Sequence, residues 1–99
     1  PGISSIRGYT TIKTLAAAFK KAGSTDTEKV VDAMIGLEVD MPWGKIRYRP
    51  QDHQSTIGSF IGQIAKGETG PIVINSEYKQ GDRYQPTDAM VKEWRKAAN

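Results

Sequence analysis

The sequence DMPWGKIRYRPQDHQ, residues 40–54, decides how this chain can fold. Apolar and polar residues alternate on both sides of a Pro-Trp-Gly step at 42–44, with the period of two that is typical of β-strands. Proline and glycine are the residue types that tight turns require. Pro50 then ends strand pairing, because proline has no amide hydrogen to donate. The stretch therefore predicts a β-hairpin of residues 38–41 and 45–49, followed by a polar loop.

A long amphipathic helix is predicted upstream, over residues 4–22. Apolar residues recur there at intervals of three and four, which stacks their side chains on one face of a helix. The stripe consists of Tyr9, Ile12, Ala16 and Phe19. The same spacing places Thr10 and Thr14 on the opposite side, where we expect solvent. Gly23 follows the last turn and supplies the left-handed conformation that commonly ends a helix.

A second helix is predicted directly after the first. Thr25 or Asp26 is a natural N-cap, because its side-chain oxygen can accept a hydrogen bond from a free backbone amide of the first turn. An apolar face then follows, made of Val30, Ala33, Met34 and Leu37. Two helices joined by about three residues are expected to pack as a helical hairpin.

Two further strands and a terminal helix are predicted downstream. Residues 56–64 carry large apolar side chains on both sides of a strand, which is typical of strands covered on both faces. Gly58 and Gly62 leave room there for close backbone approach. The last strand begins at Pro71 and includes Tyr78. Thr87 or Asp88 caps the terminal helix, whose buried side is expected to contain Met90, Val91, Trp94 and Ala97 or Ala98.

Composition sets limits on the function. The net charge of +3 and the pI of about 9.3 allow a small basic nucleic-acid-binding domain. The 14 Lys and Arg residues are scattered, however, and mostly alternate with acids, so an ordinary solvated surface is favoured over a phosphate-binding face. The chain has no cysteine, which excludes disulfides and thiolate metal ligands. No apolar run reaches the roughly 20 residues that a membrane helix needs.

The sequence contains no recognisable catalytic device. His53 is the one histidine, and Asp52 and Ser55 lie beside it. Sequence neighbours in an extended segment seldom point toward one another, whereas a catalytic triad needs groups that converge in space. A hydrogen-bonded loop residue is therefore the favoured interpretation of His53. We predict no enzyme, no metal site and no cofactor, and we expect Trp43 to cover the end of the core.

The order of these motifs resembles the C-terminal part of type I periplasmic solute-binding proteins, in the family that serves branched-chain amino acid ABC transporters. The resemblance extends from about residue 8 to residue 94. It is carried by Gly8-Tyr9 at the helix start, Lys21-Ala22-Gly23 at its end, residues 24–30, Gly36-Leu37, the turn at 41–44, residues 49–54 and residues 60–64.

The resemblance implies an α/β fold that is the C-terminal portion of a two-lobed protein. The chain would then be a fragment of a larger protein. Residues 1–50 would complete the N-terminal lobe, and residues 51–65 would form a strand that crosses the hinge. Residues 66–99 would supply a strand and the terminal helix of the C-terminal lobe.

The resemblance also implies site residues. Residues at the start of the first helix approach the ligand cleft in this family, so Tyr9 is a candidate ligand contact. Its place on the apolar stripe leaves core packing beside Ile12 open as an alternative. His53, Gln54 and Thr56 would lie in the hinge, and most other ligand contacts would lie upstream of this chain.

The implied function is that of the extracytoplasmic substrate-binding component of an ABC importer. Its ligand would be an amino acid or a related small carboxylate, and its partners would be the membrane permease and the remainder of the parent chain. A periplasmic location with a signal peptide upstream is expected. A ligand-sensing domain of the same fold in a signalling receptor is the alternative. The isolated chain would expose its first helix and last strand edges, which favours a homodimer or a domain swap.

Overall fold

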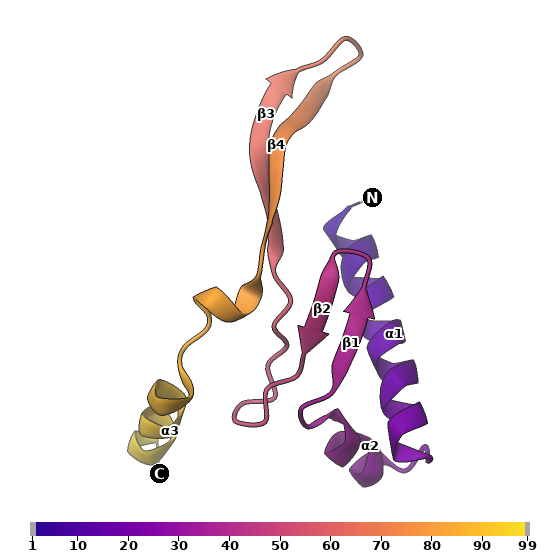
Figure 1. Ribbon diagram of the computed structural model, residues 1–99, viewed down its shortest axis with the longest axis vertical. Coiled ribbons are helices and arrows are strands. Elements are labelled where there is room, and N and C mark those ends of the chain that lie inside the picture. The colour runs from indigo at the N-terminus through magenta and orange to yellow at the C-terminus, as the bar shows by residue number, and fades with distance from the viewer. Residues whose placement is uncertain (1, 99) are drawn as a thin grey trace.

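The computed structural model describes residues 2–98 and combines helices with antiparallel strands (Figure 1). In chain order the elements are α1 (Ile3–Ala22), α2 (Thr27–Met34), β1 (Glu38–Met41), β2 (Gly44–Arg47), β3 (Ser59–Lys66), β4 (Pro71–Lys79), η1 (Gly81–Tyr84) and α3 (Asp88–Ala97). This is the mixed α/β arrangement that the sequence predicted. No helix in the described part of the chain is long and apolar enough to cross a membrane.

The helical hairpin forms as predicted, with the expected residues at its ends. Gly23 ends α1 at φ 61°, and its amide donates to the carbonyl oxygen of Phe19. Asp26 caps α2, because its Oδ1 accepts a hydrogen bond of 3.1 Å from the amide of Lys29. Both signals are local in sequence, which is why they could be predicted without knowledge of the tertiary structure.

The core of the molecule lies between this helix pair and the β1–β2 hairpin. The two strands pair antiparallel, with Val39 opposite Ile46 and Met41 opposite Gly44. Ile46 is completely buried. The buried cluster consists of Ala18, Val30, Leu37, Val39, Met41 and Ile46. Trp43 packs against this cluster at the turn, as predicted.

The expectation that Thr10 and Thr14 face solvent was wrong. Thr10 and Thr14 are buried, and they lie with Ala18 along the face that meets the hairpin. The Thr10 hydroxyl donates to the carbonyl oxygen of Ile6 at 2.8 Å, and the Tyr48 hydroxyl donates to Thr14 Oγ1 at 3.2 Å. Small side chains with satisfied hydroxyls allow the helix to approach the strands closely. The apolar stripe is exposed, as expected for the isolated chain, with Ile12 at 68%.

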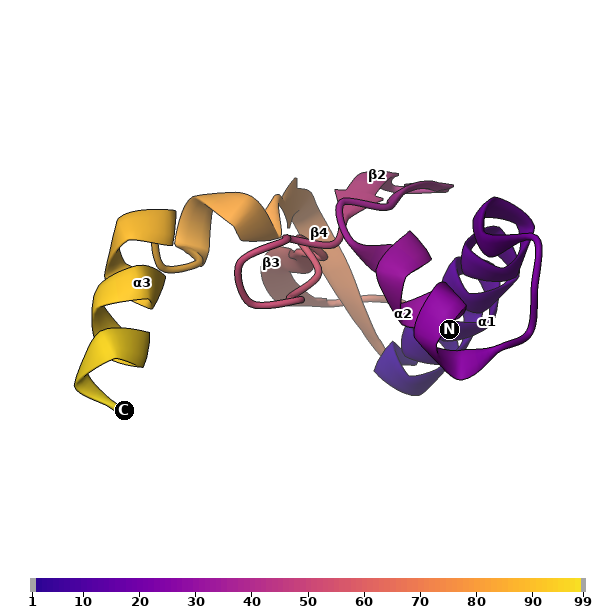
Figure 2. The ribbon, with the colours of Figure 1, turned by 90° about the horizontal axis from the view of Figure 1, so that it is seen from below.

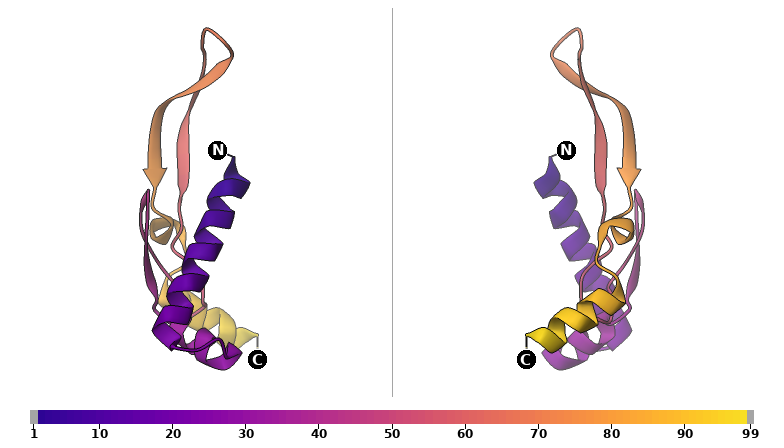
Figure 3. Two further views of the ribbon diagram at one scale, coloured as in Figure 1. Left: turned by 90° about the vertical axis from the view of Figure 1, so that its right-hand side faces the viewer. Right: turned by 90° about the vertical axis from the view of Figure 1, so that its left-hand side faces the viewer.

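Strands β3 and β4 form a separate antiparallel ribbon that projects past the N-terminal end of α1 (Figures 1 and 3). A bulge interrupts the pairing, because Gly62 faces both Asn75 and Ser76, with Asn75 at φ 52°. The expectation that this strand is covered on both faces is not met within residues 2–98. Ile64 is 82% exposed, and its partner Val73 is 64% exposed. The radius of gyration is accordingly 17.1 Å, against about 13 Å for a compact chain of this length.

Helix α3 lies on the opposite side of the molecule from α1 and α2 (Figure 2). Thr87 caps it, since its hydroxyl oxygen accepts from the amide of Met90 at 3.3 Å. The predicted buried side is only partly right. Val91 is buried, whereas Met90 and Trp94 remain 42% and 54% exposed, because only the first turn of the helix meets the rest of the described chain.

Candidate functional site

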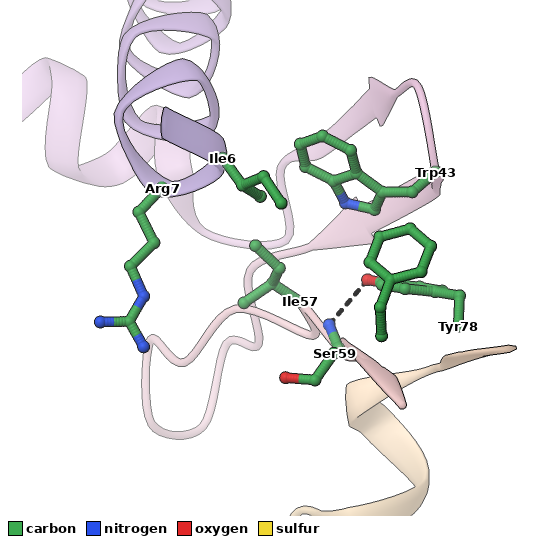
Figure 4. Close-up of a pocket in the computed structure, with 8 residues that line it drawn as sticks. Ile6, Arg7, Trp43, Ile57, Ser59 and Tyr78 are labelled. Atoms are coloured by element: carbon green, nitrogen blue, oxygen red, sulfur yellow. Dashed lines mark hydrogen bonds between the residues drawn. The ribbon is translucent and has the colours of Figure 1, made fainter. Parts of the chain in front are cut away.

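A cavity of about 420 Å³ opens where α1 and the β1–β2 hairpin meet the base of the β3–β4 ribbon (Figure 4). Its walls come from the N-terminal turns of α1, the β1–β2 turn, the start of β3 and the end of β4. The lining residues are Ile6, Arg7, Trp43, Ile57, Gly58, Ser59, Phe60 and Tyr78. Four segments that are distant in sequence therefore build one concave site, which is the usual setting of a small-molecule site.

Two backbone segments lie in contact at the floor of the cavity. They are the connection that leads into β3, residues 56–58, and the connection that leaves β4, residues 79–81. The Gly58 amide donates to the Tyr78 hydroxyl at 2.7 Å (Figure 4). A Cβ atom on Gly58 would overlap the backbone carbonyl of Lys79, and one on Gly81 would overlap the carbonyl of Ile57. Only glycine allows the outgoing and returning backbones to lie this close. The sequence predicted the close approach at Gly58 but not its partner.

The chemistry of the cavity combines apolar walls with hydrogen-bond donors. Ile6, Ile57 and Trp43 turn toward one another in Figure 4, while Arg7 extends away from them. Trp43 Nε1 is buried without a hydrogen-bond partner in the described chain. The rings of Phe60 and Tyr78 lie 5.0 Å apart between centroids. None of the eight lining residues is acidic, so this cavity suits an apolar group and acceptor atoms better than a cation.

Tyr9 lies beside the cavity without lining it. Its ring packs edge-on against Trp43, with centroids 6.1 Å apart. Lys13 Nζ lies 5.5 Å from the centroid of the same ring and donates to the phenol oxygen at 3.3 Å. Tyr9 is 47% exposed, so it is not packed in a core within the described residues. Its role as a ligand contact stays a prediction.

The predicted hinge residues occupy two different settings. His53 and Gln54 sit at an exposed loop tip, where the His53 amide donates to the Arg49 carbonyl at 2.9 Å and His53 has φ 58°. Thr56 is 4% exposed and is fixed to the strand edge at Arg47 by two hydrogen bonds of 2.9 Å. Thr56 therefore leads directly into the cavity floor, whereas His53 lines a smaller groove beside α2.

The environment of His53 differs from that of a catalytic triad. Asp52 accepts from the Gln54 amide at 3.1 Å and forms an ion pair of 3.3 Å with Arg49. Its carboxylate is thus engaged away from the imidazole. No cluster of three or more potential metal ligands occurs in the part of the chain that the structure describes.

Sequence reasoning missed most of the cavity. Ile57 and Tyr78 were predicted only as parts of strands, and no function was predicted for Arg7. Nothing local in the sequence indicates that these elements converge, because the cavity is lined by the first helix together with ends of the third and fourth strands. The sequence indicated the cavity only through Trp43 in a turn and through Gly58 in the strand that follows.

Comparison with known proteins places this geometry in context. A family model described as periplasmic binding protein matches residues 1–69. The fold is similar to the crystal structure of an ABC-type branched-chain amino acid transporter from Rhodopseudomonas palustris, with a TM-score of 0.66 and 28% sequence identity. The similarity covers 76% of this chain and 21% of that chain, so this chain spans about a fifth of the length of that protein. No curated protein matches the sequence.

Proposed function

Because the chain belongs to the periplasmic binding protein family, we propose that it forms part of an extracytoplasmic solute-binding protein of an ABC importer. Its helices and antiparallel strands are a portion of the type I periplasmic binding protein fold, as the sequence predicted. The proposed ligand is an amino acid or a related small carboxylate, and the proposed partner is a membrane permease. The family match over residues 1–69 is the observation that carries this proposal.

The proposed architecture places the hinge at the two touching connections. Residues 1–50 complete one lobe, residues 51–65 cross the hinge, and residues 66–99 belong to the other lobe. The close pairing of Gly58 and Gly81 supports this division, because a hinge needs short connections that are anchored at both ends. Thr56 supplies one anchor through its two hydrogen bonds to Arg47. His53 and Gln54 absorb backbone change in the loop before it.

The cavity beside this hinge is the proposed ligand contact on this chain. Closure of the lobes buries a ligand there against Ile57 and Phe60, which supply an apolar wall. Trp43 Nε1 has an unused hydrogen to donate, and a buried donor without a partner costs about 1–3 kcal/mol. The atom is covered in this structure, so lobe closure would have to open it to a carboxylate oxygen, and that contact would remove the penalty. Tyr9 packs edge-on against the indole of Trp43 and contacts the ligand at the edge of the cavity.

Calorimetric titration of the full-length protein tests the proposal. The probes are L-leucine, 4-methylpentanoate, which lacks the ammonium group, and 3-methylbutylamine, which lacks the carboxylate. We expect binding of one or both carboxylates and none of the amine, since no acidic residue lines the cavity. Absence of heat and of thermal stabilisation with every amino acid and small carboxylate in a wider panel would refute a solute-binding role of this kind.

A matched pair of variants tests the location of the site. Trp43→Phe removes the indole N–H at the cavity and is expected to weaken carboxylate binding about five-fold or more, since buried interface aromatics are commonly worth over 1 kcal/mol. Trp94→Phe makes the same change on α3, where the side chain is exposed. Equal affinities for the two variants would place the ligand elsewhere.

A further inference from the structure

Arg49 lies at the centre of a buried polar cluster that joins α3 to the end of the β1–β2 hairpin. Its side chain is 7% exposed, although it carries a permanent positive charge. Nη1 donates to the carbonyl oxygen of Pro86 at 2.8 Å and to Gln85 Oε1 at 3.4 Å. Nη2 donates to Asp88 Oδ1 at 3.1 Å and pairs with Asp52 Oδ2 at 3.3 Å. One guanidinium therefore joins its own loop to the start of α3, and Arg49 and Asp88 are 39 residues apart in sequence.

The two carboxylates that share Arg49 are not equivalent. Asp52 belongs to the same loop as Arg49, three residues later, and its side chain is 13% exposed. Asp88 is the first residue of α3, and its side chain is 55% exposed. Gln51 reinforces the exposed side, because its Nε2 donates to Asp88 Oδ2 at 2.7 Å. Asp52 is close to Arg49 in sequence and its carboxylate is mostly buried. Asp88 is distant in sequence and its carboxylate is half exposed to solvent.

We propose that Arg49 is a positioning residue, and that its pair with Asp88 is a releasable latch between α3 and residues 49–52. Removal of one partner from a buried ion pair is strongly unfavourable when the other charge is left unpaired. Here Asp52 stays on Arg49 when Asp88 leaves, and Asp88 becomes hydrated. The latch can therefore open without leaving a buried charge alone.

The structure also indicates where α3 would turn when the latch opens. Gln85 remains fixed, because its Nε2 donates to the carbonyl oxygen of Ser55 at 2.7 Å. The helix begins at Asp88, and its cap Thr87 belongs to the helix. The carbonyl oxygen of Pro86 also stays on Arg49 Nη1, so motion is confined to the backbone between Pro86 and Asp88. Few other contacts resist it, since Val91 is the single buried side chain of α3.

Distance measurement between two spin labels tests the latch directly. These 99 residues contain no cysteine, so Lys29→Cys on α2 and Lys92→Cys on α3 give unique attachment sites within them, and any cysteine elsewhere in the full-length protein is replaced by serine. We expect Asp88→Asn to raise the open population about five-fold, the effect of a pair worth about 1 kcal/mol whose carboxylate is half exposed. Added salt shifts the parent protein in the same direction, because it screens the exposed carboxylate. Amide exchange in α3 should accelerate by a similar factor while β1 and β2 stay protected.

Two further variants separate the latch from other effects. Glu93→Gln removes the same charge from the same helix, where Glu93 makes no ion pair with any described residue, and should leave the distances unchanged. Asp52→Asn should lower the stability of the whole domain rather than release α3 alone. A double-mutant cycle of Asp88→Asn with Arg49→Met should be non-additive, which a helix-dipole effect of Asp88 would not produce.

The outcomes decide the proposal without reference to any ligand, so it stands or falls independently of the transport role. Release of α3 in Asp88→Asn but not in Glu93→Gln supports it. Equal distances in all three proteins, or additive effects in the cycle, would overturn it. Global unfolding of Asp88→Asn would overturn it as well, because the pair would then be structural rather than releasable.

Discussion

Gly58 is where the outgoing connection touches the returning one, and its lack of a side chain is a structural requirement. Gly58→Ala would drive a methyl group into the Lys79 carbonyl. Overpacking of this kind costs about 1–3 kcal/mol. We expect a lower urea midpoint by circular dichroism. Gly8→Ala is the matched control, since nothing lies within 4 Å of a Cβ there and alanine favours an exposed helix by about 0.5–1 kcal/mol. Equal destabilisation of both variants would contradict the close approach.

The partly buried hydrogen bond between Tyr48 and Thr14 allows a second test at the same scale. Thr14→Val keeps the shape of the side chain but leaves the Tyr48 hydroxyl without its acceptor. An unsatisfied buried group costs about 1–3 kcal/mol. Adding Tyr48→Phe should recover part of this loss, because both polar groups are then gone. Chemical denaturation of the single and double variants measures the coupling, and strict additivity would show that the hydrogen bond contributes nothing.

Local residue signals were predictable from the sequence, whereas long-range partners were not. Asp26 and Thr87 cap helices because their side-chain oxygens meet amides only three residues later. The same reasoning could not find Asp88 as the partner of Arg49, because nothing between them in sequence encodes the contact. Trp43 was predicted to cover the core, but its unpartnered Nε1 depends on where Ile57 and Tyr78 arrive.

At the scale of elements, α1 shows why a hydrophobic pattern does not identify a buried face. The helix carries an apolar stripe and, on another side, a stripe of threonine and alanine. The β1–β2 hairpin packs against the second stripe, because the hydroxyls of Thr10 and Thr14 are hydrogen-bonded and their small side chains permit close approach. The apolar stripe predicts a second contact surface instead. A helix with two buried faces is typical of the interior of a larger protein.

The bulge in the β3–β4 ribbon gives an element-scale prediction. Asn75 adopts φ 52°, a left-handed conformation that asparagine tolerates and β-branched residues avoid. Asn75→Val should destabilise the ribbon by about 1–2 kcal/mol. Asn75→Gly should leave it unchanged or slightly more stable, because glycine adopts positive φ freely. Amide exchange of β3 and β4 measures both effects, and equal protection in the two variants would mean that the bulge relaxes without strain.

At the scale of the whole molecule, the exposed apolar faces share one explanation. The outer face of α1, both faces of the β3–β4 ribbon and the outer side of α3 all present large hydrophobic side chains to solvent. Among them are Ile12, Ile61, Ile64, Val73 and Trp94, each more than half exposed. Soluble proteins rarely leave contiguous surfaces of this kind open. We propose that further parts of a two-lobed binding protein cover them, because the chain spans about a fifth of the length of its structural relative.

Substitution on the outer face of α1 tests this coverage in the full-length protein. Ile12→Lys places a charge where we expect an apolar contact, and loss of a buried isoleucine costs about 1.5–3 kcal/mol before the charge is counted. Thr11→Lys introduces the same side chain at the next, exposed position of the same helix. We expect thermal unfolding at a clearly lower temperature for Ile12→Lys alone. If both variants unfold like the parent, the stripe faces water. If Ile12→Lys instead dissociates a dimer, as light scattering would detect, a second copy covers the face in place of the other lobe.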